Sequence, residues 1–333
     1  MNPLNYQMNA QLQRWLYREN PSWVFRQIGR SFEYLTPRKM IMPISDSGLP
    51  CPTLVIGGLT VGGSGKTPIA AYIASLIHQT LGLSVALVCR GWGGQESAPR
   101  RILSSRPGVD GDEATMLLSM VPEGVTLWAS RDLESARQKA SADADVVVID
   151  DGLCTSRLGR THNLVVVDST APRNPIPAGP YRESLLNLDR ADFVWLHKID
   201  EPGARPLTGS READLTSRYA AGSLILSDGT RRSVDWLQGR EITVVCGIGR
   251  PESFIHRLES LGAKIVGGVV CADHRSASPR SLAEFVNGPP ILTTRKDAAR
   301  WVGDPSPMVL DVDVEIMSGE ERLHSFLRGV CLK

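Results

Sequence analysis

Short apolar runs recur along the chain between positions 53 and 198, and segments of helical periodicity separate them. The runs are TLVIGGL (53–59), SVALVCR (84–90), VVVID (146–150), NLVVVD (163–168) and ADFVWLHK (191–198). The helical segments include TPIAAYIASLIHQTL and GDEATMLLSM. Apolar runs bounded by turns are typical of buried strands, and strands that alternate with helices favour a parallel sheet covered on both faces. The pattern therefore predicts an α/β fold.

A second α/β series follows a connector at 200–217, which is rich in glycine, proline and charge. Its segments are REITVVCGIG, PESFIHRLESLGA, KIVGGVVCA, SPRSLAEFVN, PPILTTRKDAARW and MVLDVDVEIM. A chain of 333 residues exceeds the usual single-domain size. We predict an N-terminal segment (1–50), a first α/β domain (51–205) and a smaller α/β lobe (206–333) that completes a cleft.

The N-terminal segment contains large apolar residues among arginines, at 15–35. From Val24 onward the apolar spacing is three to four residues, which predicts an amphipathic, basic helix. Such a helix either lies in a membrane interface, with its cations toward anionic head groups, or packs on the body of the protein. The sequence leaves both alternatives open.

Composition and charge narrow the class of protein without naming a partner. The chain is 42% hydrophobic and 22% charged, with a formal net charge of +1, so it fits a soluble enzyme and gives no support for a nucleic-acid-binding surface. The six cysteines lack zinc-ligand spacing, and several lie in apolar runs, which favours free buried thiols in a reducing compartment. We find neither a cleavable secretory signal nor an apolar stretch of about 20 residues, the length that crosses a bilayer. We therefore expect the protein to stay in the cytoplasm.

A glycine-rich loop stands between the first predicted strand and the first predicted helix. A strand, a glycine-rich turn and a helix N-terminus together form a phosphate site, because converging backbone N–H groups bind phosphate oxygens. Lys66 is expected to reach the β- and γ-phosphates, and the Thr67 hydroxyl to ligate Mg²⁺. The expected nucleotide contacts are Thr60, Gly62, Gly63, Ser64, Gly65, Lys66 and Thr67. Thr60 stands where the general motif has glycine, and Gly62 and Gly63 are expected to supply the flexibility.

A magnesium-nucleotide site also needs acidic residues at the end of a neighbouring strand to hold the metal. The run VVVI leads into Asp150 and Asp151, which matches the strand-end acid that holds magnesium in nucleotide hydrolases. We therefore predict a magnesium-nucleotide site on a doubly wound, mostly parallel P-loop sheet, with Thr67, Asp150 and Asp151 as metal ligands.

Further short motifs follow in order along the chain. They are Arg90-Gly-Trp-Gly-Gly94, Gly111-Asp-Glu113, Asp150-Asp-Gly-Leu153, Pro177-Ala-Gly-Pro-Tyr-Arg-Glu183, Gly247-Ile-Gly-Arg-Pro-Glu252, Asp273-His274 and Thr294-Arg-Lys-Asp297. Together with the variant phosphate loop, this order resembles the lipid A 4′-kinase (tetraacyldisaccharide 4′-kinase) family of P-loop kinases, from about position 53 to 301.

The resemblance implies transfer of the ATP γ-phosphate to the 4′-hydroxyl of a tetraacylated glucosamine disaccharide 1-phosphate in lipid A biosynthesis. It implies a peripheral place on the cytoplasmic face of the bacterial inner membrane, where the lipid-linked substrate is met. It also implies that Asp112 and His274 form a catalytic pair beside Lys66. A positioned base that takes the proton of a sugar hydroxyl makes that hydroxyl a better nucleophile, and a carboxylate orients an imidazole.

The chain departs from the family's usual pattern at several positions. The Asp-Asp-Gly motif usually continues with an aromatic residue or Leu and then Gln-His, whereas here Cys154 and Thr155 follow Leu153. A histidine beside the metal and phosphates is therefore missing. Trp92 replaces the usual Tyr, Ala114 a common Pro and Arg295 the usual Glu.

Two loop arginines and two glycines are weaker candidates for substrate contact. Arg90 and Arg182 either clamp a substrate phosphate bidentately or lie in solvated loops. Gly91 and Gly93 either admit a ligand close to the backbone or shape a turn. Asp168, after the strand 163–167, is predicted to be a helix cap or a solvated loop residue rather than a sheet-end ligand.

Three functions agree with these motifs. The first is a membrane-peripheral lipid-sugar kinase, which requires Lys66 and depends on lipid. The second is a P-loop kinase or metal-chaperone GTPase that acts on a soluble acceptor or a protein partner, and it is indifferent to lipid. The third is a non-catalytic nucleotide-gated module, whose main activity tolerates Asp112→Asn.

Overall fold

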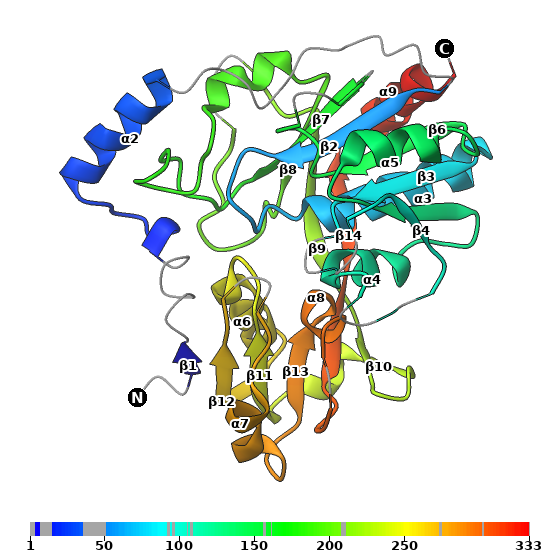
Figure 1. The fold of residues 1–333 in the computed structure, drawn as a ribbon. Helices are drawn as coiled ribbons and strands as arrows, with labels where there is room; N and C mark the ends of the chain where they lie inside the picture. Colours follow the sequence, from blue (N-terminus) through cyan, green and yellow to red (C-terminus); the bar gives the residue numbers. More distant parts are fainter. Residues whose placement is uncertain are drawn as a thin grey trace. The chain divides into compact units, whose positions relative to one another are not determined.

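The computed structural model describes residues 4–6, 15–35, 51–91, 94, 97–104, 106, 109–155, 158–160, 162–207, 211–272, 275–301 and 303–332. The chain divides into two compact units, whose elements are labelled in Figure 1. Unit 1 combines Met1–Tyr17 with Tyr219–Asp313, and unit 2 combines Arg18–Arg218 with Val314–Lys333. The long strands β9 (Leu215–Ile225) and β14 (Met308–Ser318) each contribute residues to both units.

Unit 2 contains a mostly parallel sheet, which confirms the predicted fold class. Its strand order is β9-β8-β7-β2-β6-β3-β5-β4. Neighbouring strands from β9 to β5 pair in parallel, and only β4 is antiparallel to its neighbour β5. The bounds are β2 (Thr53–Gly58), β3 (Val85–Cys89), β4 (Arg100–Ile102), β5 (Val125–Ala129), β6 (Val146–Asp150), β7 (His162–Asp168) and β8 (Phe193–His197).

Helices cover both faces of this sheet because its strands are apolar on both sides. On one face Leu54 and Ile56 of β2 join a core built with α3 (Lys66–Leu81), α4 (Asp112–Leu118) and α9 (Glu320–Cys331). On the other face lies α5 (Leu133–Ala140), whose Arg137 reaches the Thr53 hydroxyl. The carboxyl end of β2 and the start of α3 thus meet at one edge of the sheet.

The C-terminal helix α9 belongs to unit 2, although residues 206–333 were predicted to form one smaller lobe. Its Leu323 is fully buried in the core of unit 2, and Phe326 stacks on Phe193 with ring centroids 4.8 Å apart. The observed division therefore differs from the predicted boundary after 205, because the apolar side of the last helix packs on the first sheet.

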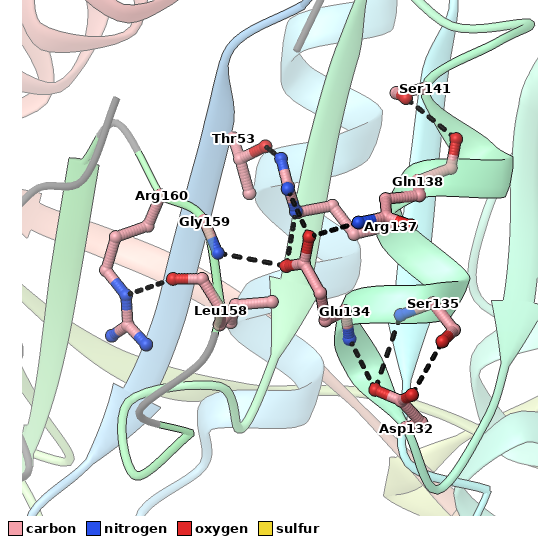
Figure 2. A network of polar contacts seen from close by, with 10 residues as sticks. All are labelled: Thr53, Asp132, Glu134, Ser135, Arg137, Gln138, Ser141, Leu158, Gly159 and Arg160. Carbon is pink, nitrogen blue, oxygen red and sulfur yellow. Dashed lines mark hydrogen bonds and ion pairs between the residues drawn. The ribbon is translucent and has the colours of Figure 1, made fainter. Parts of the chain in front are cut away.

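A polar network on the α5 face ties this helix to the amino end of β2 (Figure 2). Asp132 caps α5 by accepting the Glu134 and Ser135 N–H groups. Glu134 binds the buried Arg137 with an N–O distance of 2.5 Å and also accepts the Gly159 N–H at 2.9 Å. The network attaches α5 to the first residue of β2, and it gives the buried guanidinium of Arg137 a carboxylate partner.

Unit 1 has a second, smaller sheet, in which β1, β12, β11, β13 and β14 pair in parallel. Its order is β1-β12-β11-β13-β14-β9, with β10 antiparallel to β9. The strands are β1 (Leu4–Tyr6), β10 (Arg231–Ser233), β11 (Glu241–Cys246), β12 (Lys264–Val270) and β13 (Ile291–Thr294). The helices are η2 (Val234–Leu237), α6 (Pro251–Ser260), α7 (Pro279–Leu282), η3 (Ala283–Phe285) and α8 (Arg295–Ala298).

The cysteines and the predicted N-terminal helix lie within the described residues. The six cysteines are free thiols, of which Cys89, Cys246 and Cys271 are buried and Cys154 is exposed. The N-terminal helix is present as α2 (Trp23–Leu35). None of the helices in the described ranges has both the length and the apolarity to cross a bilayer.

Candidate nucleotide-binding site

The predicted phosphate loop connects β2 to α3 at the carboxyl edge of the sheet in unit 2. Gly62, Gly63 and Gly65 have φ angles of 69°, 70° and 82°, in the left-handed region that favours glycine. Backbone N–H groups in such a turn converge on one concavity, and the start of α3 adds the positive end of its dipole. The loop therefore has the backbone of an anion site.

Thr60 takes the first position of the motif without backbone strain. Its φ angle is not positive, and its hydroxyl donates to the Gly62 carbonyl at 3.3 Å. Thr60 also forms an isolated antiparallel bridge with Tyr181. The left-handed turns fall on Gly62 and Gly63, so a Cβ at position 60 is tolerated.

Three carboxylates surround the lysine of this loop. Lys66 Nζ lies 3.7 Å from Asp151 Oδ1. Burial alone would lower the pKa of Lys66, but the charges of Asp151, Asp150 and Glu113 outweigh it and raise that pKa. Lys66 is therefore held as an ammonium ion at neutral pH. Glu113 lies in the Gly111-Asp-Glu113 motif but was not predicted to be a site residue.

Asp150 and Thr67 fit a divalent cation. Burial and the nearby Glu113 raise the pKa of Asp150 to about 7, against the influence of Lys66 and a hydrogen bond from Thr67. Asp150 Oδ1 is buried and has no hydrogen-bond partner among the described residues. A buried, unpaired carboxylate oxygen beside a hydroxyl is a donor set that Mg²⁺ accepts. The described residues hold no cluster of three or more His, Cys, Asp or Glu ligands, so phosphate and water oxygens would complete the shell.

The proposed catalytic pair is only partly visible. Asp112 begins α4 and is 7% exposed, and its Oδ1 accepts the Glu113 N–H at 3.0 Å. Because the charge of Glu113 acts on both Lys66 and Asp150, the start of α4 lies beside the phosphate loop. His274 lies outside the described residues, so its pairing with Asp112 stays a prediction.

The segment after Asp151, which lacks the histidine that the family usually has, is hydrogen-bonded to a buried arginine. Arg160 is fully buried and donates to the carbonyls of Gly152, Leu153 and Thr155. Burial lowers the pKa of Arg160 to about 10. Figure 2 shows Arg160 beside the Gly159 N–H that Glu134 accepts. At the position of the missing histidine, the Thr155 hydroxyl accepts Arg90 Nη2 at 2.8 Å.

The weaker substrate candidates have different surroundings. Arg90 lies at the carboxyl end of β3, with its guanidinium on Thr155. Gly91 has a φ of 60°, and Gly93 lies outside the described residues. Arg182 faces the back of the phosphate loop, where its Nη2 donates to the Thr60 carbonyl at 3.0 Å. It therefore supports the loop, and its contact with a substrate stays a prediction.

A buried lysine next to the phosphate loop was not found by sequence reasoning. Lys198 Nζ donates to the Gly63 carbonyl and lies 2.8 Å from Asp168 Oδ2. Asp168 was predicted to be a helix cap or a solvated loop residue, but it ends β7 and its side chain is fully buried in this ion pair. It also accepts the Thr170 N–H at 2.9 Å.

Arg295, where the family usually has Glu, forms an ion pair within unit 1. Its Nη2 lies 2.6 Å from Asp311 Oδ2, and Arg231 Nη1 lies 2.9 Å from the same oxygen. Burial would raise the pKa of Asp311, but the two guanidinium groups outweigh it and lower that pKa. The departure is therefore matched by an acid on β14.

Arg295→Glu is expected to lower the free energy of unfolding by about 2 kcal/mol at pH 7, since a partner of a buried carboxylate is replaced by a like charge. The depressed pKa of Asp311 contributes stability above its unfolded pKa, and this is lost as pH falls through the folded value. Urea unfolding should show the difference at pH 7 and a smaller one below about pH 4. Arg295→Gln, which adds no charge, should cost less. Equal stability of Arg295→Glu and wild type at pH 7 would contradict the assignment.

Comparisons with known proteins agree with these motifs. A family model described as Tetraacyldisaccharide-1-P 4'-kinase matches residues 21–331. A "Tetraacyldisaccharide 4'-kinase" of Methylorubrum populi is 34% identical over 288 residues, which cover 83% of this chain and 84% of that protein. One of Azoarcus sp. is also 34% identical, with 77% and 75% covered. The structure of LpxK from Aquifex aeolicus, described as in complex with ATP, is similar with a TM-score of 0.66. It is 24% identical and covers 98% of this chain and 100% of its own, which shows a shared fold.

Proposed function

The chain belongs to the tetraacyldisaccharide-1-phosphate 4′-kinase family and is a transferase of lipid A biosynthesis, and we propose that its donor is magnesium-bound ATP. The acceptor is the 4′-hydroxyl of a tetraacylated glucosamine disaccharide 1-phosphate. The observation that carries the proposal is the buried Asp150 carboxylate beside Thr67 and Lys66, at the foot of a phosphate loop.

The residues of this site have different roles in phosphoryl transfer. The loop amides and Lys66 would bind the β- and γ-phosphates, and Thr67 with Asp150 would hold Mg²⁺. Asp151, the third predicted metal ligand, lies 3.7 Å from Lys66 Nζ, and its contact with the metal stays a prediction. When bound, Mg²⁺ neutralises charge on the phosphate oxygens. The ammonium of Lys66 stays protonated among the acids, so its charge is available as negative charge shifts toward the leaving phosphate.

The acceptor side is assigned through the family. His274 takes the proton of the 4′-hydroxyl, and Asp112 orients and charge-stabilises its imidazole. Arg90, with Gly91 and Gly93, contacts the phosphorylated disaccharide, since a guanidinium binds phosphate oxygens bidentately. Arg182 contributes to acceptor binding only indirectly, by supporting the phosphate loop through the Thr60 carbonyl.

Contact with the inner membrane is proposed for one side of α2. Trp23, Val24 and Ile28 are 72%, 55% and 47% exposed. The opposite side is anchored, because a Cβ added at Gly29 would lie 3.0 Å from the Pro175 carbonyl oxygen. An exposed apolar stripe on an anchored helix fits the boundary between head groups and acyl chains, which supports a peripheral contact of this protein with the inner membrane.

The triple change Trp23→Ser, Val24→Ser and Ile28→Ser is expected to weaken binding to anionic phospholipid vesicles by about tenfold or more, because roughly 25 cal/mol is lost per Å² of apolar surface withheld from the bilayer. Co-sedimentation with vesicles measures this. Leu103→Ser, which removes an equally exposed apolar residue far along the chain, should leave binding unchanged. Equal binding of the triple variant and wild type would remove α2 from the proposed membrane contact.

The function is tested by transfer of labelled γ-phosphate from ATP to tetraacyldisaccharide 1-phosphate in mixed micelles, with and without magnesium. We expect magnesium-dependent formation of a 4′-phosphorylated product, and no transfer to a soluble glucosamine disaccharide. Transfer to the soluble sugar alone would assign the chain to a soluble acceptor. Magnesium-ATP binding with neither product would reject the kinase.

A further inference from the structure

Lys198 follows the last residue of β8 and connects that strand end to the phosphate loop. Its side chain is 4% exposed, and its Nζ donates to the Gly63 carbonyl. The same Nζ lies 2.8 Å from Asp168 Oδ2, at the end of the neighbouring strand β7. Three segments that are far apart in sequence are therefore joined by one ammonium group at the carboxyl edge of the sheet.

The Lys198–Asp168 ion pair costs free energy, both in backbone strain and in desolvation, which argues for a role beyond holding the fold together. Lys198 has a φ of 64°, a left-handed conformation that non-glycine residues rarely adopt. Its side chain and that of Asp168 are both buried, and the desolvation of such a pair offsets most of its attraction. Strained backbone and buried charge pairs collect at functional sites, where the surrounding structure maintains them.

The direction of the contact determines which side of the loop is free for a ligand. The C=O of Gly63 and the N–H of Ser64 belong to one planar trans peptide, so they point in opposite directions. Because Lys198 holds the Gly63 oxygen, the Ser64 N–H is turned away from Lys198. In a phosphate loop the amide N–H groups are the ligands of the phosphate oxygens. Lys198 also adds positive charge behind the loop.

We infer that Lys198, oriented by Asp168, is a positioning residue that sets the Gly63–Ser64 peptide so that the Ser64 N–H binds a nucleotide phosphate. Lys198 does not touch the nucleotide. The inference rests on the proposed function only in that the loop binds a nucleoside triphosphate, and it is independent of the acceptor.

The test is calorimetric binding of Mg-ADP, together with the KM for ATP and for the disaccharide. Lys198→Met combined with Asp168→Asn avoids an unpaired buried charge. This double variant is expected to bind Mg-ADP about 10- to 100-fold more weakly, because a loop moved by about 1 Å loses alignment with the phosphates. Its KM for ATP should rise, while its KM for the disaccharide stays within about twofold, since a positioning role concerns the nucleotide alone. Lys198→Arg, which keeps a cationic donor, should recover part of the affinity.

The matched control is another ion pair of unit 2, at the opposite end of β2, in which the arginine is buried. Arg137→Met with Glu134→Gln removes the pair shown in Figure 2 and should lower the melting temperature without changing Mg-ADP affinity. Unchanged Mg-ADP affinity in a folded double variant overturns the inference, as does a parallel rise of both KM values or a Lys198→Arg protein that binds Mg-ADP no better than the double variant. Because Mg-ADP binding needs no lipid, wild type that binds Mg-ADP but phosphorylates no disaccharide rejects the proposed function and leaves the inference standing.

Discussion

Lys66→Met is expected to reduce the rate of phosphate transfer by about 1,000-fold, the usual upper effect of removing one preorganised donor from developing negative charge. The side chain is 13% exposed, and the charges of Asp151, Asp150 and Glu113 keep it protonated. Methionine fills a similar volume without the charge, so the loop retains its packing while the phosphates lose their cation. Single-turnover transfer of labelled γ-phosphate to the disaccharide measures the loss directly.

The control for Lys66→Met is Lys139→Met on the exposed side of α5, which should transfer phosphate at the wild-type rate. Circular dichroism separates loss of catalysis from loss of fold. A folded Lys66→Met protein that keeps more than a tenth of the wild-type rate would show that this loop is not the site of transfer. Mg-ADP affinity should fall less than the rate, because the Lys66 ammonium stabilises the charge that develops in the transition state more than it stabilises the bound nucleotide.

The parts of the site that could be predicted from sequence are local. A strand, three glycines, Lys66 and the start of a helix follow one another in the chain, so the loop needs no long-range information. The same holds for Asp150, because four apolar residues lead directly into it. Parallel neighbours then bring both strand ends to one edge, since β2 pairs with β6. The fold class and these residues therefore followed from periodicity and motif order.

The parts that could not be predicted depend on contacts between distant segments. Lys198 and Asp168 looked like ordinary polar residues after strands, and only the order β8-β7-β2 places both behind the phosphate loop. Arg295 was visible as a departure, but its partner Asp311 lies on another strand. Helix α9 also follows the second α/β series in sequence and packs in the first sheet. Buried charge pairs of this kind carry no periodic signal.

Asp112→Asn and His274→Ala are each expected to reduce kcat by about 100- to 10,000-fold, the usual contribution of a positioned acid–base group. Asparagine keeps the shape of Asp112 at the start of α4 and loses the charge that would stabilise an imidazolium. If the two residues act on one proton, the double variant should be hardly slower than the slower single variant, because removing either member disables the unit. Mg-ADP binding should be unchanged in all three proteins.

The double-variant comparison separates a catalytic pair from two independent contributions. Strictly multiplicative losses would show that Asp112 and His274 act separately, and Asp112 would then be reassigned to supporting Glu113, whose N–H it accepts at 3.0 Å. Asp143→Asn, an exposed acid of the same unit, should leave kcat unchanged. The comparison also decides the third function considered from sequence, since a nucleotide-gated module without catalysis would tolerate Asp112→Asn. Coupled losses in kcat at constant Mg-ADP affinity would instead place the proton transfer on this pair.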